Sequence, residues 1–141
     1  MDRLIENSDA FRARNEILQT ITGIGPQVSR TLLIHLPELG RYTRQTIAAL
    51  VGLAPFNDDS GDHAGQRHIR GGRGKVRIGM YQAAIAAIRH CPRMKAFYAA
   101  LKARGKASRV AIIAIARKLL VIANAMVRDM KPFRDPANSV C

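Results

Sequence analysis

Apolar residues recur at helical spacing along most of the chain and divide it into successive helices. In residues 16–36 the apolar stripe stops at Gly23-Ile24-Gly25-Pro26 and then resumes, which predicts a helix, a tight turn and a second helix. Pro26 fits the first turn of the second helix, because N–H groups in that turn make no hydrogen bond within the helix and the missing N–H of proline costs nothing there. Later stripes predict helices over residues 43–51, 73–90, from Pro92 to near Gly105, and 107–130.

The same pattern predicts which residues are buried. Thr43 can cap the third helix. The helix from Pro92 is expected to bury Met94, Phe97, Tyr98 and Leu101, and the broad apolar face of the last helix makes it the most buried element. Arg117 and Lys118 interrupt the most apolar region, residues 110–126, so we expect that region to be too short and too charged to span a membrane.

One long stretch, from Gly52 through Arg73 to Lys75 and Arg77, lacks this rhythm and is rich in glycine. A loop this long in a small domain is usually functional or disordered, and the apolar periodic sequence on both sides favours a functional loop. Arg67-His68-Ile69-Arg70 could form one strand of a small β-hairpin there. The predicted fold is therefore all-α, with five to six helices, a helix-hairpin-helix motif and one long Gly-rich loop. Residues 16–134 form the domain, residues 1–15 a linker or incoming helix, and residues 135–141 a tail.

The net charge of the chain is positive and unevenly distributed, and both features indicate the kind of partner that it binds. The 141 residues carry a formal net charge of +13, and residues 66–141 hold 17 Lys and Arg against 2 Asp and Glu. Such a balance favours a polyanion, with nucleic acid first and an anionic membrane surface second. Because the N-terminus lacks the apolar core of a signal peptide, we expect the protein to be cytoplasmic, with no membrane as its partner.

Two groups of residues are candidates for phosphate binding. Gly23 and Gly25 can place backbone N–H groups at the start of the second helix, where the helix dipole also favours an anion. The alternative is that these glycines only permit close packing, and the motif does not distinguish DNA from RNA. Arg73, Lys75 and Arg77 lie in the first turns of a helix, where cations oppose the dipole, so a bound phosphate is one explanation and a solvated surface the other.

Ser60 is the sharpest candidate for chemistry, although spacing alone describes it better as a turn residue. His63 or His68 could pair with it, but no base is fixed by the sequence. The nearby acidic residues Asp58, Asp59 and Asp62 do not have the spacing of a known metal site, and we predict no metal site in this chain.

Several short blocks occur together in an order that points to a family. They are Gly23-Ile-Gly, Leu36-Pro-Glu-Leu, Gly52-Leu-Ala-Pro, Ser60-Gly, Gly65-x-x-x-Ile69-x-Gly-Gly-Arg73-x-x-x-Arg77, Tyr81-x-Ala-Ala, Phe97-Tyr-x-x-Leu, Gly105-Lys106 and Lys118-Leu-Leu. With these blocks the chain resembles, over about residues 17–133, the C-terminal transposase domain of the insertion-sequence 110 family, the DEDD-type, bridge-RNA-guided recombinases.

The resemblance implies a role for each candidate residue. Ser60 would be the nucleophile that attacks a DNA phosphodiester and forms a phosphoserine link. Gly23 and Gly25 would place backbone donors on DNA, and a run of cations would clamp its phosphates, with Lys106 and Lys118 as further contacts. That run consists of Arg67, Arg70, Arg73, Lys75 and Arg77. The implied partners are DNA, a guide RNA and further copies of the full-length protein.

The resemblance also implies a missing part. Full-length family proteins carry a nuclease-like N-terminal domain whose acidic residues hold Mg²⁺, and residues 1–15 contain no such domain. The expectation is an excised domain or a truncated gene product that needs no cofactor of its own and does not cleave DNA alone. The alternative is a non-catalytic helix-hairpin-helix module that binds nucleic acid.

Overall fold

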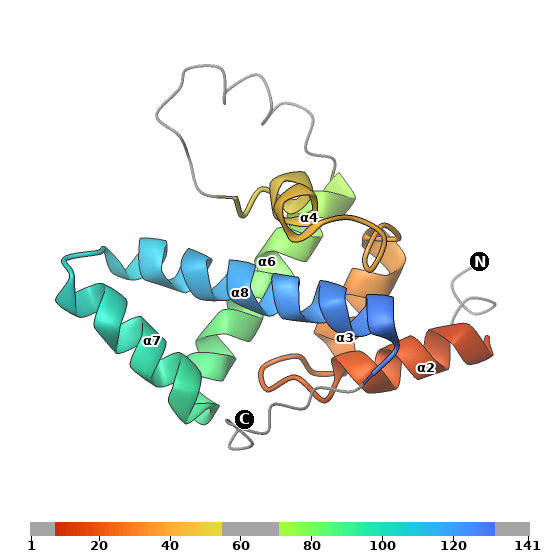
Figure 1. The fold of residues 1–141 in the computed structure, drawn as a ribbon, viewed down its shortest axis with the longest axis horizontal. Helices are drawn as coiled ribbons and strands as arrows, with labels where there is room; N and C mark the ends of the chain where they lie inside the picture. Colours follow the sequence, from red (N-terminus) through yellow and green to blue (C-terminus); the bar gives the residue numbers. More distant parts are fainter. Residues whose placement is uncertain (1–7, 55–70, 132–141) are drawn as a thin grey trace.

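The computed structural model describes residues 8–54 and 71–131, and within these ranges every regular element is an α-helix (Figure 1). The six helices are α2 (Asp9–Leu18), α3 (Pro26–His35), α4 (Arg44–Val51), α6 (Gly71–His90), α7 (Pro92–Ala103) and α8 (Ser108–Asp129). The all-α prediction is confirmed. Residues 55–70 of the Gly-rich loop, with the β-hairpin expected near residues 67–70, lie outside the described residues. Gly71 and Gly72, expected in the loop, are the first residues of α6.

The central element is α8, which crosses the middle of the molecule in Figure 1 and contacts α2, α4, α6 and α7. Apolar residues at helical spacing give it a wide buried face, so several helices can pack around it. Its buried residues are Ala111, Ile115, Ala116, Leu119, Leu120, Ala123, Asn124, Met126 and Val127. The prediction that the last helix is the most buried one is confirmed for the described part of the chain.

The length of α8 corrects one expectation. The helix has 22 residues and is long and apolar enough, by length and composition alone, to cross a membrane. By length and composition, the expectation that this region is too short and too charged was wrong. The helix extends beyond residues 110–126 at both ends and stays apolar enough despite Arg117 and Lys118. Half of its most apolar window is buried against the rest of the structure. That burial is typical of the core helix of a compact domain.

The second long helix, α6, packs against α8 and also contacts α3, α4 and α7. Its buried face combines Met80 with Ala83, Ala84 and Ala87, all at most 1% exposed. Small alanine side chains let neighbouring backbones approach closely, and they allow α6 to serve as the common surface for the surrounding helices.

The helix ends mostly follow the predicted signals. The Thr43 hydroxyl accepts a hydrogen bond from the backbone N–H of Thr46 at 3.1 Å, and proline opens both α3 and α7, as expected. The first helix begins earlier than residue 16, because Ser8 caps α2 by accepting from the N–H of Phe11 at 3.0 Å. The proposed domain limits at residues 16 and 134 stay a prediction.

The buried face of α7 was predicted only in part. Met94 is buried, and Tyr98 and Leu101 are partly buried, but Phe97 is 37% exposed. The prediction for Phe97 was wrong because α7 lies at the edge of the molecule. Only α6 and α8 pack against it, so part of its apolar surface is left uncovered. The Phe97 ring instead lies beneath Lys118, whose Nζ is 5.0 Å from the ring centroid.

Candidate nucleic-acid interface

The turn between α2 and α3 brings Gly23 and Gly25 into different surroundings. Gly23 has a φ of +101°, and a Cβ atom there would lie 2.4 Å from the carbonyl oxygen of Ala83 on α6. The glycine is therefore needed where the turn packs on α6. A Cβ atom on Gly25 would meet nothing within 4 Å. Of the two predicted backbone donors, Gly25 is the one beside open space.

Gly25 is also the N-cap of α3, and no side chain caps this helix end. The first N–H groups of a helix have no acceptor within the helix, and the dipole makes this end favourable for an anion. The orientation of α3 is fixed from behind by Ser29, which is fully buried and donates its hydroxyl to Asn15 Oδ1 on α2 at 2.6 Å. The start of α3 is thus a fixed and uncapped helix terminus.

Ser60 lies outside the described residues, as do Arg67, Arg70 and the polar residues Asp58, Asp59, Asp62, His63 and His68. The structure does describe the residues that flank segment 55–70 on both sides. These flanks show where the segment leaves the helical body and where the chain returns to it.

On the N-terminal side, the flank is held by Arg117 of α8. Its guanidinium donates to the carbonyl oxygen of Leu53 at 2.9 Å, and Leu53 is itself 1% exposed. Burial lowers the pKa of Arg117, but an arginine remains charged at neutral pH. The sequence showed Arg117 only as an interruption of an apolar stripe. A cation on an otherwise buried helix face was the signal that it has a specific partner.

On the C-terminal side, Arg73 at the start of α6 forms a two-pronged ion pair with Glu38. One of its nitrogens donates to Glu38 Oε1 at 3.1 Å, and a second donates to Oε2. Both side chains are about one fifth exposed. The hydrogen bond from Arg73 lowers the pKa of Glu38 below its ordinary value of 4.5, and the same bond raises the pKa of Arg73. Arg73 therefore has a carboxylate partner within the chain.

The three predicted cations of α6 do not share one face of the helix. Residues two apart on an α-helix are rotated by about 200°, so Lys75 lies nearly opposite Arg73, whereas Arg77 is only about 40° away. Lys75 is exposed and Arg77 is partly buried. Arg77 therefore lies on the same side of α6 as Arg73, which is paired with Glu38, while Lys75 lies on the opposite side.

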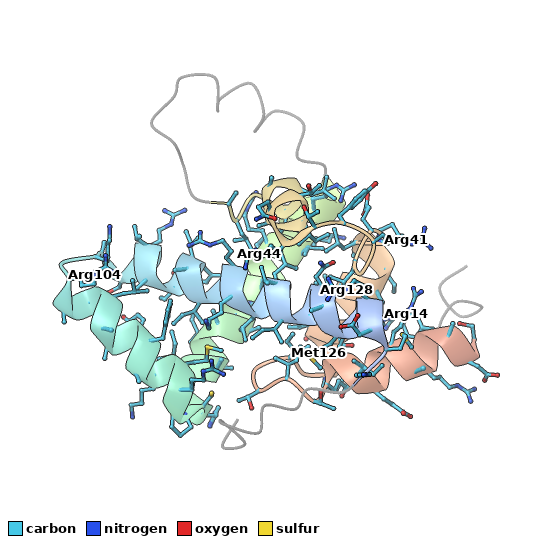
Figure 2. All side chains as sticks on the ribbon, in the orientation of Figure 1. Arg14, Arg41, Arg44, Arg104, Met126 and Arg128 are labelled. Carbon is cyan, nitrogen blue, oxygen red and sulfur yellow. The ribbon has the colours of Figure 1, made fainter. Side chains whose placement is uncertain are left out.

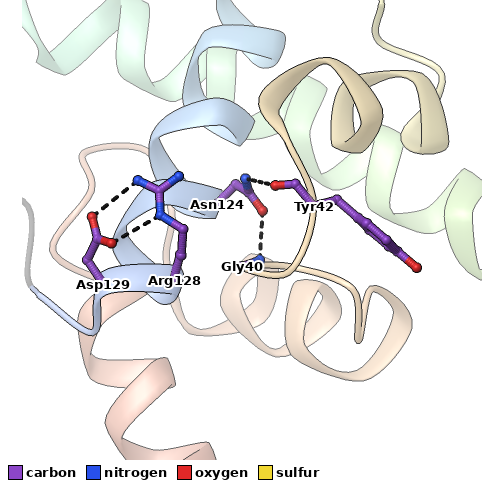
Figure 3. A network of polar contacts seen from close by, with 5 residues as sticks. All are labelled: Gly40, Tyr42, Asn124, Arg128 and Asp129. Carbon is purple, nitrogen blue, oxygen red and sulfur yellow. Dashed lines mark hydrogen bonds and ion pairs between the residues drawn. The ribbon is translucent and has the colours of Figure 1, made fainter.

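The connection that carries Glu38 is fastened to α8 by Asn124, a residue that the sequence reasoning missed (Figure 3). Asn124 is 2% exposed; its Oδ1 accepts from the N–H of Gly40 at 2.7 Å, and its Nδ2 donates to the carbonyl oxygen of Tyr42 at 2.9 Å. A polar residue on a buried helix face was the available signal. Asn124 thereby helps to place Glu38 beside the start of α6.

The described residues do not fit a metal site. They contain four carboxylates, Asp9, Glu16, Glu38 and Asp129, and they hold no group of three His, Cys, Asp or Glu that could bind a metal ion. Two of these carboxylates are paired with arginine: Glu38 is paired with Arg73, and Asp129 is paired with Arg128, the pair drawn in Figure 3. Asp9 lies in the first turn of α2, where its charge suits the helix dipole.

Comparison with known proteins gives a consistent picture. The family model described as "Transposase IS116/IS110/IS902 family" matches residues 15–99. The "Pilin gene-inverting protein" of Moraxella bovis is 30% identical over 135 residues, which cover 93% of this chain and 42% of that protein. The "Insertion element IS110 uncharacterized 43.6 kDa protein" of Streptomyces coelicolor is 29% identical over 115 residues, or 80% of this chain and 28% of that protein. The chain thus spans less than half the length of these relatives.

Proposed function

The chain belongs to the transposase IS116/IS110/IS902 family, and on that premise we propose that it is the DNA-binding and strand-exchange domain of an insertion-sequence transposase. The observation that carries the proposal is the family match over residues 15–99, which includes Ser60 and every cation from Arg67 to Arg77. The names of the relatives, a gene-inverting protein and an insertion-element protein, support recombination of DNA as the shared role.

Ser60 is the proposed nucleophile. Its Oγ attacks the phosphorus of a DNA phosphodiester, so that one P–O bond forms while the bond from phosphorus to a sugar oxygen breaks. The serine proton passes to a base, and the released sugar oxygen takes up a proton. Because one phosphoester bond replaces another, the later attack by a DNA hydroxyl can rejoin the strands without ATP.

The cations that follow Ser60 in the sequence are assigned to phosphate binding. Arg67, Arg70 and Arg77 bind the non-bridging phosphate oxygens, where negative charge gathers during the transfer. Lys75 faces away from Arg73 and binds a neighbouring phosphate instead. The backbone N–H groups at the start of α3, beside Gly25, bind a further phosphate.

The described flanks support this assignment of the segment between α4 and α6. Arg117 holds Leu53 on one side, and Glu38 holds Arg73 on the other. Both anchors come from elements distant in sequence, so the two ends of the Ser60 segment start from fixed points on the helical body. Fixed ends limit the volume that the proposed nucleophile has to search, which lowers the entropic cost of reaching the phosphate.

The proposed chemistry includes a metal ion supplied by another part of the full-length protein. We propose that carboxylates of a nuclease-like N-terminal domain hold Mg²⁺ in the full-length protein, where the metal would help to activate the serine hydroxyl. The described residues offer no such carboxylate group. Copies of the full-length protein and a guide RNA are the further proposed partners.

The replacement Ser60→Ala tests the proposal in a protein that joins this chain to the metal-binding domain. Recombination should be lost, while the affinity for DNA should change less than about twofold because no charge is removed. Ser139→Ala is the matched control, since it makes the same chemical change outside residues 15–99. If Ser60→Ala still recombines DNA, the chain is a non-catalytic nucleic-acid-binding module, the second candidate function.

The two candidates share the DNA-binding surfaces and differ only in the task of Ser60.

A further inference from the structure

A second concentration of positive charge lies where α7 turns into α8. Lys102, Arg104, Lys106 and Arg109 occur within eight residues, and all four are exposed. We call these four residues the α7–α8 corner. Figure 2 shows Arg104 at the end of the molecule where α7 meets α8, apart from Arg44 and Arg41 near α4. The corner is therefore separate from the start of α6.

The backbone at the corner is a tight turn. Gly105 has a φ of +88°, its N–H donates to the carbonyl oxygen of Lys102 at 3.0 Å, and the N–H of Lys106 donates to that of Leu101 at 3.1 Å. Across the turn, Lys102 Nζ donates to the Ser108 hydroxyl at 2.9 Å. The turn thus gathers the end of one helix and the start of the next into one compact region.

These charges have no carboxylate to balance them in the described part of the chain. Its four carboxylates lie on α2, between α3 and α4, and at the last residue of α8. A helix of 22 residues is about 33 Å long, so Asp129 lies about that far from the start of α8, several times the screening length of roughly 8 Å at physiological salt. Arg73 and Arg128, in contrast, each have a carboxylate partner.

The position of the charges makes their concentration more costly. Arg109 lies in the first turn of α8, and no side chain caps this helix end. Cations next to the positive end of a helix dipole repel it, and they also repel one another. A polyanion bound at the corner would turn this repulsion into attraction, since it would meet both the side chains and the helix terminus.

We propose that the α7–α8 corner binds the phosphate backbone of duplex DNA as a second surface, distinct from the region around segment 55–70. The proposal rests on the DNA binding of the proposed function but does not depend on Ser60 as nucleophile. With two separated basic surfaces, one domain can hold DNA on both sides of the point where strands are exchanged, or hold two duplex segments at once.

The test measures the affinity of the 141-residue chain for a short duplex as a function of salt. The corner variant Arg104→Gln/Lys106→Gln/Arg109→Gln leaves Lys102 in place, because Lys102 contributes to the turn. The control variant Arg12→Gln/Arg89→Gln/Lys131→Gln removes the same charge from exposed positions elsewhere. If three phosphate contacts are lost, the corner variant should bind roughly 100-fold more weakly at 0.15 M salt, and its salt slope should fall by about 2.7.

The control variant should lose only a few-fold in affinity and keep most of its salt slope. Equal losses in the two variants would overturn the proposal and leave the proposed function standing, whereas no binding by the unaltered chain would overturn both. An RNA hairpin is measured in parallel, and a loss of affinity for RNA alone would overturn the assignment to DNA. If the corner variant loses its helical circular dichroism, Arg104→Gln and Lys106→Gln are tested singly, each with an expected loss of roughly fivefold.

Discussion

At the scale of single residues, two glycines of one short motif have opposite surroundings. Gly23 is enclosed by the backbone of α6, and Gly25 is next to open space. The sequence presents them as equivalent, because both are glycines on either side of Ile24. Only the packing of the turn on α6 separates a glycine needed for structure from one that is available to a ligand.

Gly23→Ala should therefore destabilise the chain strongly. A residue with a side chain is strained at a φ of +101°, and its Cβ would collide with the Ala83 carbonyl oxygen, so we expect a loss of about 2–4 kcal/mol in the free energy of unfolding. Gly25→Ser is the matched control, because serine is a good N-cap and meets no atom there, and its effect should stay within about 0.5 kcal/mol. Urea denaturation measures both. Equal stability of the two variants would contradict this assignment.

For the polar residue Asn124, too, the packing of the chain sets the contacts, and the sequence does not show them. Its two hydrogen bonds reach Gly40 and Tyr42, which are more than 80 positions away in the sequence. A helical pattern marks Asn124 as lying on a buried face, but it cannot name the partner, since the partner is set by how the α3–α4 connection packs on α8. The partners of Arg117 and Arg73 were hidden from the sequence for the same reason.

At the scale of helices, apolar periodicity and end signals predicted most of the fold. The stripes predicted the helices between residues 16 and 130, and Pro26, Thr43 and Pro92 mark helix starts in the structure. Periodicity failed at Phe97, because it shows that a face is apolar but not whether another helix covers it. It also placed the start of the first helix too late, since α2 begins with few apolar residues.

The contact between the α3–α4 connection and the start of α6 depends on the Glu38–Arg73 pair. The pKa of Glu38 is lowered in the folded chain, so the pair stabilises the fold above the ordinary carboxyl pKa of 4.5 and loses this effect as the pH falls through the lowered value. Glu38→Gln should reduce the free energy of unfolding by about 1 kcal/mol at neutral pH, since the pair is partly exposed. The difference from the unaltered chain should shrink as the pH falls through the lowered pKa of Glu38.

Denaturation at several pH values measures this difference. Asp129→Asn is the control, because it removes a carboxylate from an arginine pair in which both side chains are about half exposed, and its effect should be smaller. A Glu38→Gln variant as stable as the unaltered chain at neutral pH would show that the pair does not fasten α6 to the α3–α4 connection.

At the scale of the whole molecule, charge and chemistry are distributed unevenly. Most of the cations lie in residues 66–141, and the described carboxylates lie away from the α7–α8 corner. The described residues carry exposed positive charge at the α7–α8 corner, and they hold no group of three His, Cys, Asp or Glu that could bind a metal ion. Under the proposed function, we expect the chain alone to bind DNA without cutting it.

The purified chain should accordingly bind duplex DNA with an affinity that falls steeply with salt, and it should leave the DNA uncut. With six to ten phosphate contacts, the affinity should fall by roughly 10³–10⁵ between 50 and 200 mM salt. Fluorescence anisotropy measures the binding, and denaturing gels with Mg²⁺ present detect cleavage. Measurable strand cleavage by this chain would contradict the proposed need for a separate metal-binding domain.

The proposed role of Ser60 as nucleophile rests on the sequence and the family match alone, because Ser60 lies outside the described residues. The most direct measurement is to trap the covalent intermediate in a protein that joins this chain to the metal-binding domain, with a nicked DNA substrate that cannot be rejoined. Mass spectrometry of the digested complex should find a nucleotide on the peptide that contains Ser60, and Ser60→Ala should abolish it. A nucleotide attached to another residue, or recombination with no covalent complex, would contradict the account.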